Sequence, residues 1–465
     1  MSELTIRLEA KSSRPLYEQI YDHIKKEIKN GGLSFEERLP STRMLAKHLQ
    51  VSRSTVELAY EQLLSEGYIE AVPYRGYFVC RLDGLLHLTD QTPVQVQRYE
   101  ETEEGYAYDF SPSGIDLNSF PHNTWKKLSR GILMENKKEF FQLGDPQGEK
   151  SLRMTIASYL HQARGVSCTA DQIVVGAGND YLLMLLSVLL GNSCTAAMEN
   201  PTYKKAYRVL RAMMKSITAV GMDQNGMDVE ELEESGANIA YVMPSHQYPM
   251  GTVMPIRRRM QLLEWAAKEE GRYIIEDDYD SEFRYKGKPI PALQGFDAVG
   301  KVVYLGTFSR SIAPSIRISY MVLPQSLLKV YQESGRIFSS TVSRVDQMLI
   351  SRFLSEGYYE RHLNRMRAIY KGRHDVLLEE LGSMSEICRI SGENAGVHLL
   401  LRFTNGMSEK EAVEKAKAAG VKVYGLSGCC IGHVPEKPTV ILGYANMEEE
   451  KIRDAVKCLR DAWSK

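Results

Sequence analysis

The chain has 465 residues, 43% of them apolar and 25% charged, and at roughly 100–200 residues per domain it should hold several domains. A composition this apolar excludes a chain that is disordered throughout. The 58 basic and 59 acidic side chains leave a net charge of −1, which excludes a polybasic protein that coats nucleic acid or membranes.

The cysteines and the N-terminus predict a cytoplasmic protein. Seven scattered cysteines form neither a paired framework nor a CxxC metal motif, so we expect reduced thiols and no metal site. Residues 1–15 lack the apolar stretch of a signal peptide, and no apolar run approaches the roughly 20 residues of a membrane span. We therefore expect no membrane partner.

Composition divides the chain into two blocks. Residues 1–80 are rich in helical patterns and end in a strand-like pair. Residues 81–106 contain a proline, several glutamines and an acidic cluster, which is typical of an exposed linker. Residues 107–465 form one long block. We predict a small DNA-reading domain over 1–80, a linker over 81–106 and a large domain over 107–465.

The first block has the pattern of a helix-turn-helix motif. A helix after Pro15 carries an apolar stripe, a short helix follows Ser41, and a third helix follows the capping residue Ser52. Small polar and arginine residues at the start of the third helix suit the major groove of DNA. Residues 68–79, with a turn at 73–75, predict a β-hairpin wing.

The segment LPSTRMLAKHLQVSRSTVELAYEQLLSEGYIEAVPYRGYFV (39–79) resembles the winged-helix domain of the GntR superfamily. Arginine can reach phosphates or guanine edges, and small hydroxyls allow a close approach. Residues 1–80 hold 11 basic and 11 acidic side chains, so operator binding needs a local arginine cluster and a dimer. The resemblance implies contacts with a double-stranded DNA operator by Arg43, Ser52, Arg53, Ser54 and Thr55, and by Arg75 and Gly76 at the wing tip.

Short apolar runs and helical patterns alternate in the second block. Helical patterns such as 181–190 and 256–268 separate the runs, which predicts a mostly parallel sheet covered on both faces. After residue 330 the pattern changes, and residues from about 345 to 465 predict a smaller α+β subdomain. The runs expected to be strands are Ile173–Val175, Ala196–Met198, Ile239–Met243, Tyr273–Ile275, Val302–Leu305 and Ile318–Leu323.

Two segments of this block suit the binding of a phosphate. VGAGND (175–180) follows a strand and opens a helix, so its amides and the helix dipole favour an anion. The segment LGTFSRSIAPSIR (305–317) follows another strand and offers Thr307, Ser309 and Arg317. These residues predict a phosphate-binding cup at the ends of two strands.

Three further residues suit an aromatic ring that bears a nitrogen and a phenolic oxygen. Asp277 and Tyr279 end the strand RYIIEDDY and, two residues apart, point to the same side. Tyr203 in ENPTY is a flat platform for stacking. Together with the phosphate cup, this set supplies three of the four features that pyridoxal phosphate (PLP) requires; the fourth is a lysine for its aldehyde. Each of these residues taken alone has an ordinary structural explanation. The prediction depends on their occurring together, in this order along the chain.

Four stretches resemble fold-type-I aminotransferases, and in particular the aminotransferase-like domain of the MocR/GabR regulators. They are GDPQGEKSLR (144–153), PSHQYPMG (244–251), IIEDDYDSEFRY (274–285) and YLGTFSRSIAPSIRISYMVLP (304–324). The fusion to a GntR winged helix is this family's hallmark. The resemblance implies the α/β fold of PLP-dependent transferases, a homodimer and a small-molecule effector, which is PLP or an amino compound.

The same resemblance assigns a role to each candidate residue. Asp277 pairs with the pyridine nitrogen, and Tyr279 with the O3′ oxygen. Tyr203 stacks on the ring. Thr307 and Arg317 bind the phosphate, with the backbone amides near Gly178 and Asn179, and Ser309 remains a candidate from its place in the sequence.

The chain departs from the family at the position of the Schiff-base lysine, where it has Arg310. A guanidinium stays charged and delocalised, so it neither bonds covalently to the cofactor nor accepts a substrate proton. It can still donate hydrogen bonds to a phosphate or a carboxylate. Lys205 and Gly428 also stand where the relatives have candidate carboxylate-binding arginines. We therefore expect non-covalent PLP and little or no transamination.

Three functions remain open at this point. The first is a transcriptional regulator that senses a small molecule in its large domain. The second is an aminotransferase with a DNA-binding appendage, which Arg310 disfavours unless another lysine, such as Lys205, replaces it. The third is a structural dimerisation domain with an empty pocket, which the retained Asp277 and Arg317 disfavour. We favour the first.

Overall fold

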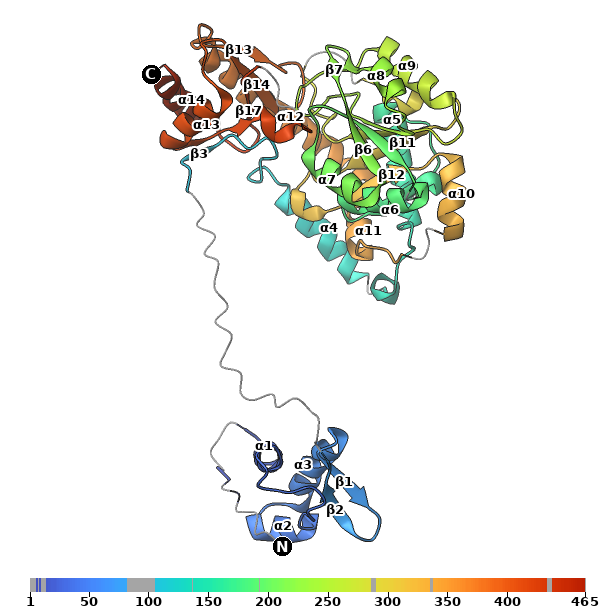
Figure 1. The fold of residues 1–465 in the computed structure, drawn as a ribbon, viewed down its shortest axis with the longest axis vertical. Coiled ribbons are helices and arrows are strands. Elements are labelled where there is room, and N and C mark those ends of the chain that lie inside the picture. The colour runs from blue at the N-terminus through green and yellow to red at the C-terminus, as the bar shows by residue number, and fades with distance from the viewer. Residues whose placement is uncertain are drawn as a thin grey trace. The chain divides into compact units, whose positions relative to one another are not determined.

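The computed structural model divides the chain into two compact units, residues 1–102 and 103–465, which are considered separately (Figure 1). Most of the predicted linker 81–106 lies outside the described residues. The described residues are 6, 8–9, 14–81, 105–135, 137–191, 193–285, 290–334, 338–432 and 437–464.

The N-terminal unit is a winged helix. Helices α1 (Leu16–Lys29), α2 (Thr42–Leu49) and α3 (Arg53–Ser65) precede an antiparallel hairpin of β1 (Ile69–Val72) and β2 (Gly76–Val79). The inward faces of the three helices form one apolar core, because residues three and four apart share a face. That core includes Ile20, Ile24, Leu45, Val56, Tyr60 and Leu63.

The larger part of the second unit is a seven-stranded sheet in the order β4-β12-β11-β10-β9-β5-β6. All neighbouring strands are parallel except β12, which runs antiparallel to both β4 and β11. This confirms the mostly parallel sheet. The strands are β4 (Ile173–Gly176), β5 (Thr195–Glu199), β6 (Ser216–Val220), β9 (Ile239–Val242), β10 (Tyr273–Asp278), β11 (Val302–Thr307) and β12 (Ser319–Val322).

Helices cover both faces of this sheet. Alternate residues of β11 show the division: Val302 and Tyr304 face one side, whereas Val303 and Leu305 pack with α6 and α10 on the other. The strands are apolar on both faces because neither face meets water. The covering helices are α4 (His122–Met134), α5 (Lys150–Arg164), α6 (Asn179–Leu190), α7 (Lys204–Met213), α8 (Val229–Glu234), α9 (Ile256–Ala267), α10 (Gln325–Ser334) and α11 (Arg344–Ser355).

The smaller part is an antiparallel sheet in the order β13-β14-β17-β16, packed with α12 (Tyr358–Gly382), α13 (Glu409–Ala418) and α14 (Glu449–Trp463). Its strands are β13 (Cys388–Ser391), β14 (His398–Phe403), β16 (Tyr424–Gly425) and β17 (Thr439–Gly443). A short strand, β3 (Tyr108–Asp109), pairs with β15 (Val421–Lys422), so the start of the unit lies against this part. A further hairpin joins β7 (Met222–Asp223) to β8 (Gly226–Met227).

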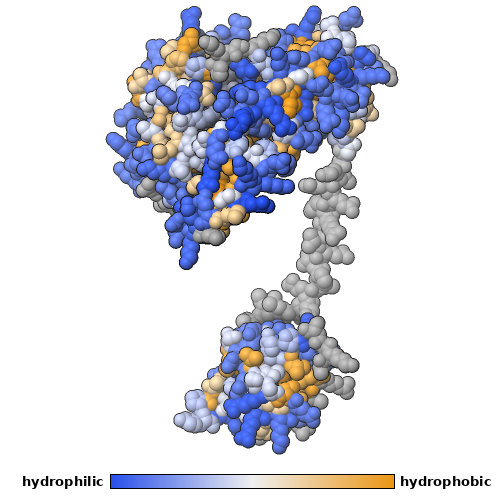
Figure 2. Space-filling model, turned by 180° about the vertical axis from the view of Figure 1, so that it is seen from behind, coloured by the Kyte–Doolittle hydropathy of each residue, from blue (hydrophilic) through white to orange (hydrophobic). Residues whose placement is uncertain are grey.

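The surfaces of both units are mostly hydrophilic, with separate apolar patches on the face drawn in Figure 2. Within the described residues, no helix is long and apolar enough to cross a membrane. All seven cysteines are free thiols. Burial raises the pKa of Cys429 to about 11, which favours its role as a core-lining thiol over a redox role.

Candidate functional site

The first candidate site is the start of α3 in the winged helix. The Ser52 hydroxyl caps the helix and accepts a hydrogen bond from the Thr55 amide at 3.2 Å. The same hydroxyl lies 2.8 Å from Ser54 Oγ and 2.7 Å from Thr55 Oγ1. Arg53 is exposed and pairs with Glu57 one turn later, at 2.7 Å. The N-terminus of α3 thus presents hydroxyls and one guanidinium to solvent.

Two other candidate DNA contacts flank this helix end in the sequence. Arg43 is exposed on α2, and Arg75 is exposed in the turn between β1 and β2, with its guanidinium 5.4 Å from the Phe78 ring centre. Tyr74 in the same turn is fully exposed and has a positive φ of 61°. Gly76 takes a φ of 111°, which a side chain rarely adopts, so this turn needs its glycine.

The second candidate site lies at the carboxyl ends of strands in the large sheet, where open α/β sheets bind their ligands. Asp277 is the penultimate residue of β10 and is 4% exposed. Asn179, the first residue of α6, donates from Nδ2 to Asp277 Oδ1 at 3.2 Å, and the Tyr241 hydroxyl donates to Oδ2. Burial raises the pKa of Asp277 to about 7, and the bond from Tyr241 opposes that rise.

Tyr279 follows β10 and belongs to a buried network. Its hydroxyl lies 3.0 Å from Nδ1 of His246, and the same nitrogen lies 3.0 Å from both oxygens of Asp280. Burial raises the pKa of Tyr279 well above its ordinary value, so the hydroxyl stays protonated. Tyr241, His246 and Asp280 were not among the residues predicted from the sequence. The signal in the sequence that could have indicated these three residues is a polar or aromatic side chain within or just after an apolar strand.

Gly178 and Arg317 lie together at the N-terminus of α6, next to Asn179. Gly178 caps α6 with a φ of 94°, and a Cβ atom there would lie 2.4 Å from Nη2 of Arg317. Arg317 itself has a positive φ of 52°. Its Nη2 donates to the Ala177 carbonyl at 3.2 Å and pairs with Asp180 at 3.3 Å. A helix N-terminus and a guanidinium therefore meet at this point.

The hydroxyls of β11 and the loop after it lie close to one another. Thr307 Oγ1 accepts hydrogen bonds from the Ser309 amide at 3.1 Å and from Ser319 Oγ at 2.8 Å. Ser309 Oγ is buried and has no hydrogen-bond partner within the described part of the chain, and the same holds for Asn179 Oδ1. A buried polar atom without a partner is costly unless a ligand or water satisfies it.

Arg310 is half-buried, and its Nη2 donates to the backbone carbonyl of Pro112. Burial raises the pKa of Tyr203 to about 12. The negative charge of Asp277 adds to this rise, and the positive charge of Arg310 opposes it. The Tyr203 ring meets the Tyr248 ring edge-on at 5.8 Å between centres. No carboxylate of the described ranges forms an ion pair with Arg310.

The two lysines at the start of α7 differ in their surroundings. Lys204 donates from Nζ to the Cys430 carbonyl, whereas Lys205 is exposed. Gly428 has open space where a side chain would begin, since a Cβ atom there would meet nothing within 4 Å. Lys205 and Gly428 therefore contribute no described contact to the residues around Asp277.

Comparisons with known proteins divide the chain in the same way as its architecture. Residues 16–79 match the family "Bacterial regulatory proteins, gntR family", and residues 114–459 match "Aminotransferase class I and II". The uncharacterized HTH-type transcriptional regulator YdeL of Bacillus subtilis is 40% identical, over 97% of each chain. The probable rhizopine catabolism regulatory protein MocR of Rhizobium meliloti is 31% identical, over 97% of this chain and 94% of the relative.

The large unit also resembles solved enzymes. The multiple substrate aminotransferase of Thermococcus profundus superposes with a TM-score of 0.70 at 27% identity, covering 78% of this chain and 92% of that enzyme. Sequence and structure therefore agree on an N-terminal gntR-type domain and a C-terminal fold-type-I aminotransferase domain.

Proposed function

This chain belongs to the MocR-type transcriptional regulators, in which a gntR-type DNA-binding domain is joined to an aminotransferase domain, and we propose that it holds PLP without a covalent bond. It is a DNA-binding regulator with an aminotransferase-like domain. One observation carries the proposal: residue 310, which the family resemblance makes the lysine position, is an arginine, while Asn179 still donates to the buried Asp277 and Gly178 still leaves room for Arg317. We call these residues, with Thr307 and Ser309, the proposed PLP pocket.

The pocket fits PLP at both of its ends. At the phosphate end, Gly178 lacks the Cβ atom that would meet Arg317, and Ser309 Oγ is a buried donor without a partner. At the ring end, Asp277 is buried and is oriented by Asn179 and Tyr241. A phosphate and a protonated pyridine nitrogen would satisfy these groups, because each meets a group of opposite charge.

Each residue of the pocket has one task. Arg317 and the amides near Gly178 bind the phosphate, together with the hydroxyls of Thr307 and Ser309. Asp277 holds a proton on the pyridine nitrogen, and a positive charge placed there keeps its carboxylate ionised. Pyridoxal phosphate, when bound, supplies an aldehyde that reacts with primary amines and a ring that withdraws electrons.

Arg310 prevents a covalent bond between the chain and the PLP aldehyde, and its guanidinium favours binding of an effector's carboxylate. Its side chain has no amine that can bond to an aldehyde, and its guanidinium is held against the Pro112 carbonyl beside Tyr203. The remaining guanidinium N–H groups can bind the carboxylate of an amino compound in a bidentate manner. We propose that such a compound, with the cofactor, is the effector.

A second aminotransferase-type function receives less support. An enzyme of this class needs a lysine at the reacting atoms. Lys204 is engaged by the Cys430 carbonyl, and Lys205 is exposed on α7. An aminotransferase would therefore require one of these two lysines to move to the reacting atoms. A regulator requires no such movement.

Exposed apolar surface supports a homodimer. Large side chains on α4 and the segment after it are more than half exposed, which is costly for a separate chain. Burial against a second copy would remove this surface from water, and twofold dimers are the commonest oligomers. These side chains are Leu133 at 54%, Met134 at 73%, Phe141 at 79% and Leu143 at 89%.

The test of the function uses the full chain. Duplexes that bind would be selected from a random pool, and the affinity of the enriched duplex would then be measured with and without PLP and a panel of amino acids. We expect one sequence to be enriched, and its affinity to change at least about threefold with an effector, which corresponds to about 0.7 kcal/mol of coupling. Failure to enrich any sequence would contradict operator binding, and an affinity unaffected by PLP would contradict the cofactor's role.

A further inference from the structure

Helix α7 carries an unbroken set of positive charges. Residues 204–215 (KKAYRVLRAMMK) contain five lysines and arginines and no acidic residue. Lys204, Arg208 and Arg211 are four and three residues apart, and this spacing places them on one face of the helix. Lys205 lies one residue into the helix, and Lys215 lies just beyond its end. We call these five side chains the α7 cluster.

Four of the five side chains of the α7 cluster are exposed, Lys204 is half-buried, and none of the five has an acidic partner among the described residues. Lys205, Arg208, Arg211 and Lys215 are all exposed. Throughout the described ranges, the ion pairs involve other cations, such as Arg258 with Asp223 and Lys268 with Glu233. Like charges on one face repel one another, and this arrangement lowers helix stability unless an anion binds.

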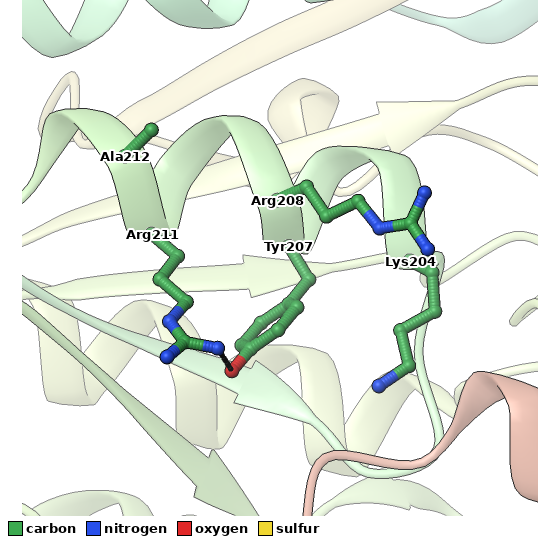
Figure 3. Close-up of a pocket in the computed structure, with 5 residues that line it drawn as sticks. All are labelled: Lys204, Tyr207, Arg208, Arg211 and Ala212. Carbon is green, nitrogen blue, oxygen red and sulfur yellow. Dashed lines mark hydrogen bonds between the residues drawn. The ribbon is translucent and has the colours of Figure 1, made fainter.

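Tyr207 orders the cluster. Lys204 Nζ lies 5.1 Å from the centre of the Tyr207 ring, and the Arg211 guanidinium lies 5.9 Å from it. Arg211 Nη1 also donates to the Tyr207 hydroxyl at 3.4 Å. Figure 3 shows the tyrosine between these two cations, which line a surface groove of about 490 Å³ together with Arg208. The ring attracts both cations and holds them at fixed positions.

The spacing of the charges indicates what kind of anion fits. Lys204 and Arg211 are seven residues apart, which is about 10 Å along the helix axis. A single phosphate ion is too small to meet both ends of such a row. A DNA strand, in contrast, presents one negative charge about every 3.4 Å along its axis, so several phosphates can meet the row together.

The winged helix carries too little net positive charge to bind DNA strongly by electrostatics alone. Residues 1–80 hold as many acidic as basic side chains, and the whole chain has a net charge of −1. Sequence-independent affinity for DNA comes mainly from neutralised phosphates, so the winged helix by itself supplies little of it. A row of cations without acidic partners elsewhere in the described residues can supply the rest.

We propose that the α7 cluster binds the phosphate backbone of duplex DNA beside the operator. The proposal rests on operator binding by the winged helix, which is part of the proposed function. It adds a second DNA-contacting surface, located on the aminotransferase-like domain. The α7 cluster positions the DNA and reads no bases, because its arginines and lysines meet phosphates along the backbone.

The test compares the salt dependence of DNA binding between variants of the full chain. The triple variant R208Q/R211Q/K215Q removes three charges from the α7 cluster. The matched control K410Q/K451Q/K457Q removes three exposed lysines from α13 and α14. Affinity for the enriched duplex with about 15 flanking base pairs on each side would be measured by anisotropy between about 50 and 200 mM salt. The slope of log K against log salt is negative, and each lost phosphate contact reduces its absolute value by about 0.9.

We expect the absolute value of the slope to fall by about 2 to 3 in the triple variant, and to stay within about 0.5 of the unaltered chain in the control variant. The charge-preserving variant R208K/R211K should keep the original slope. A PLP titration that matches the unaltered chain shows that each variant is folded. A duplex trimmed to the operator should remove the difference between the variants.

Two outcomes separate this inference from the proposed function. Equal slopes for the triple variant and the unaltered chain, with operator binding intact, would overturn the role of the α7 cluster and leave the regulator standing. Absence of duplex binding by the unaltered chain would instead overturn the proposed function on which the inference rests.

Discussion

Asn179 donates a hydrogen bond to Asp277 at 3.2 Å and thereby joins the first residue of α6 to the end of β10, although the two residues are 98 positions apart. The same amide's Oδ1 is buried and lacks a partner among the described residues. In the proposed PLP site, Asn179 would therefore link the phosphate end to the ring end. A ligand that occupies both ends would be oriented by this one side chain.

The first prediction concerns Asp277. We expect Asp277→Asn to weaken PLP binding by about 10- to 100-fold, because a charge-assisted hydrogen bond contributes about 1.5–3 kcal/mol. The change is isosteric, and Tyr241 can still donate to the remaining oxygen. Absorbance titration of the full chain measures the affinity. An unchanged affinity would mean that Asp277 does not meet the ring nitrogen.

The second prediction concerns the missing lysine. We expect Arg310→Lys to gain a PLP adduct that borohydride makes permanent, whereas the unaltered chain binds PLP reversibly. The reason is that a lysine has an amine that can bond to the aldehyde and a guanidinium does not. Mass spectrometry after borohydride treatment measures the adduct. Arg310→Gln is the control, and a permanent adduct on the unaltered chain would contradict the assignment.

The third prediction tests the phosphate end with a matched pair of glycines at the two ends of α6. Gly178 and Gly191 both have a positive φ, 94° and 86°. A Cβ on Gly178 would meet Arg317 at 2.4 Å, whereas one on Gly191 would meet nothing within 4 Å. Both alanine variants should lose roughly 1 kcal/mol of stability. Only Gly178→Ala should lose PLP binding. Equal PLP affinities in the two variants would contradict a phosphate site at Gly178 and Arg317.

The fourth prediction concerns Arg53 at the start of α3. We expect Arg53→Ala to weaken operator binding by about 10- to 100-fold, since a good base contact is worth about 1–3 kcal/mol. Stability should change by less than about 0.5 kcal/mol, because the pair with Glu57 is exposed. Glu57→Gln frees the arginine and should retain binding. An anisotropy titration in which Arg53→Ala equals the unaltered chain would remove Arg53 from the interface.

The fifth prediction concerns pH and Glu199. This residue is fully buried, and burial raises its pKa to about 8, against about 4.3 in an unfolded chain. Between these values the folded state holds a proton that the unfolded state has released. The contribution of Glu199 to the free energy of unfolding of the C-terminal unit therefore falls as pH rises from about 4 to about 8.

Glu199→Gln should remove part of this fall and raise the free energy of unfolding at pH 8 by on the order of 2 kcal/mol. Denaturant unfolding at pH 5 and pH 8 measures the difference. The exposed residue Glu450 offers a control, since Glu450→Gln should leave both values unchanged. A larger gain at pH 5 than at pH 8 would contradict the assignment of a raised pKa.

Local sequence patterns predicted most of the elements that carry the sites. Ser52 and Ser41 cap helices as expected, because a cap depends on residues within four positions. The buried runs of the large sheet became β4, β5, β9, β10, β11 and β12. Strand β6 was missed, since it lies at the edge of the sheet and its half-exposed sequence lacks a continuous apolar run.

The amino-acid sequence by itself determined the family, the two domains' types and the absence of a lysine at residue 310, because these depend on residue identity and order. Only the tertiary structure decided which distant residues meet. Tyr241 reaches Asp277 because β9 and β10 are neighbours, and Arg310 meets Pro112, 198 positions away. Such contacts follow from strand order and from packing between segments far apart in the chain, which no local pattern encodes.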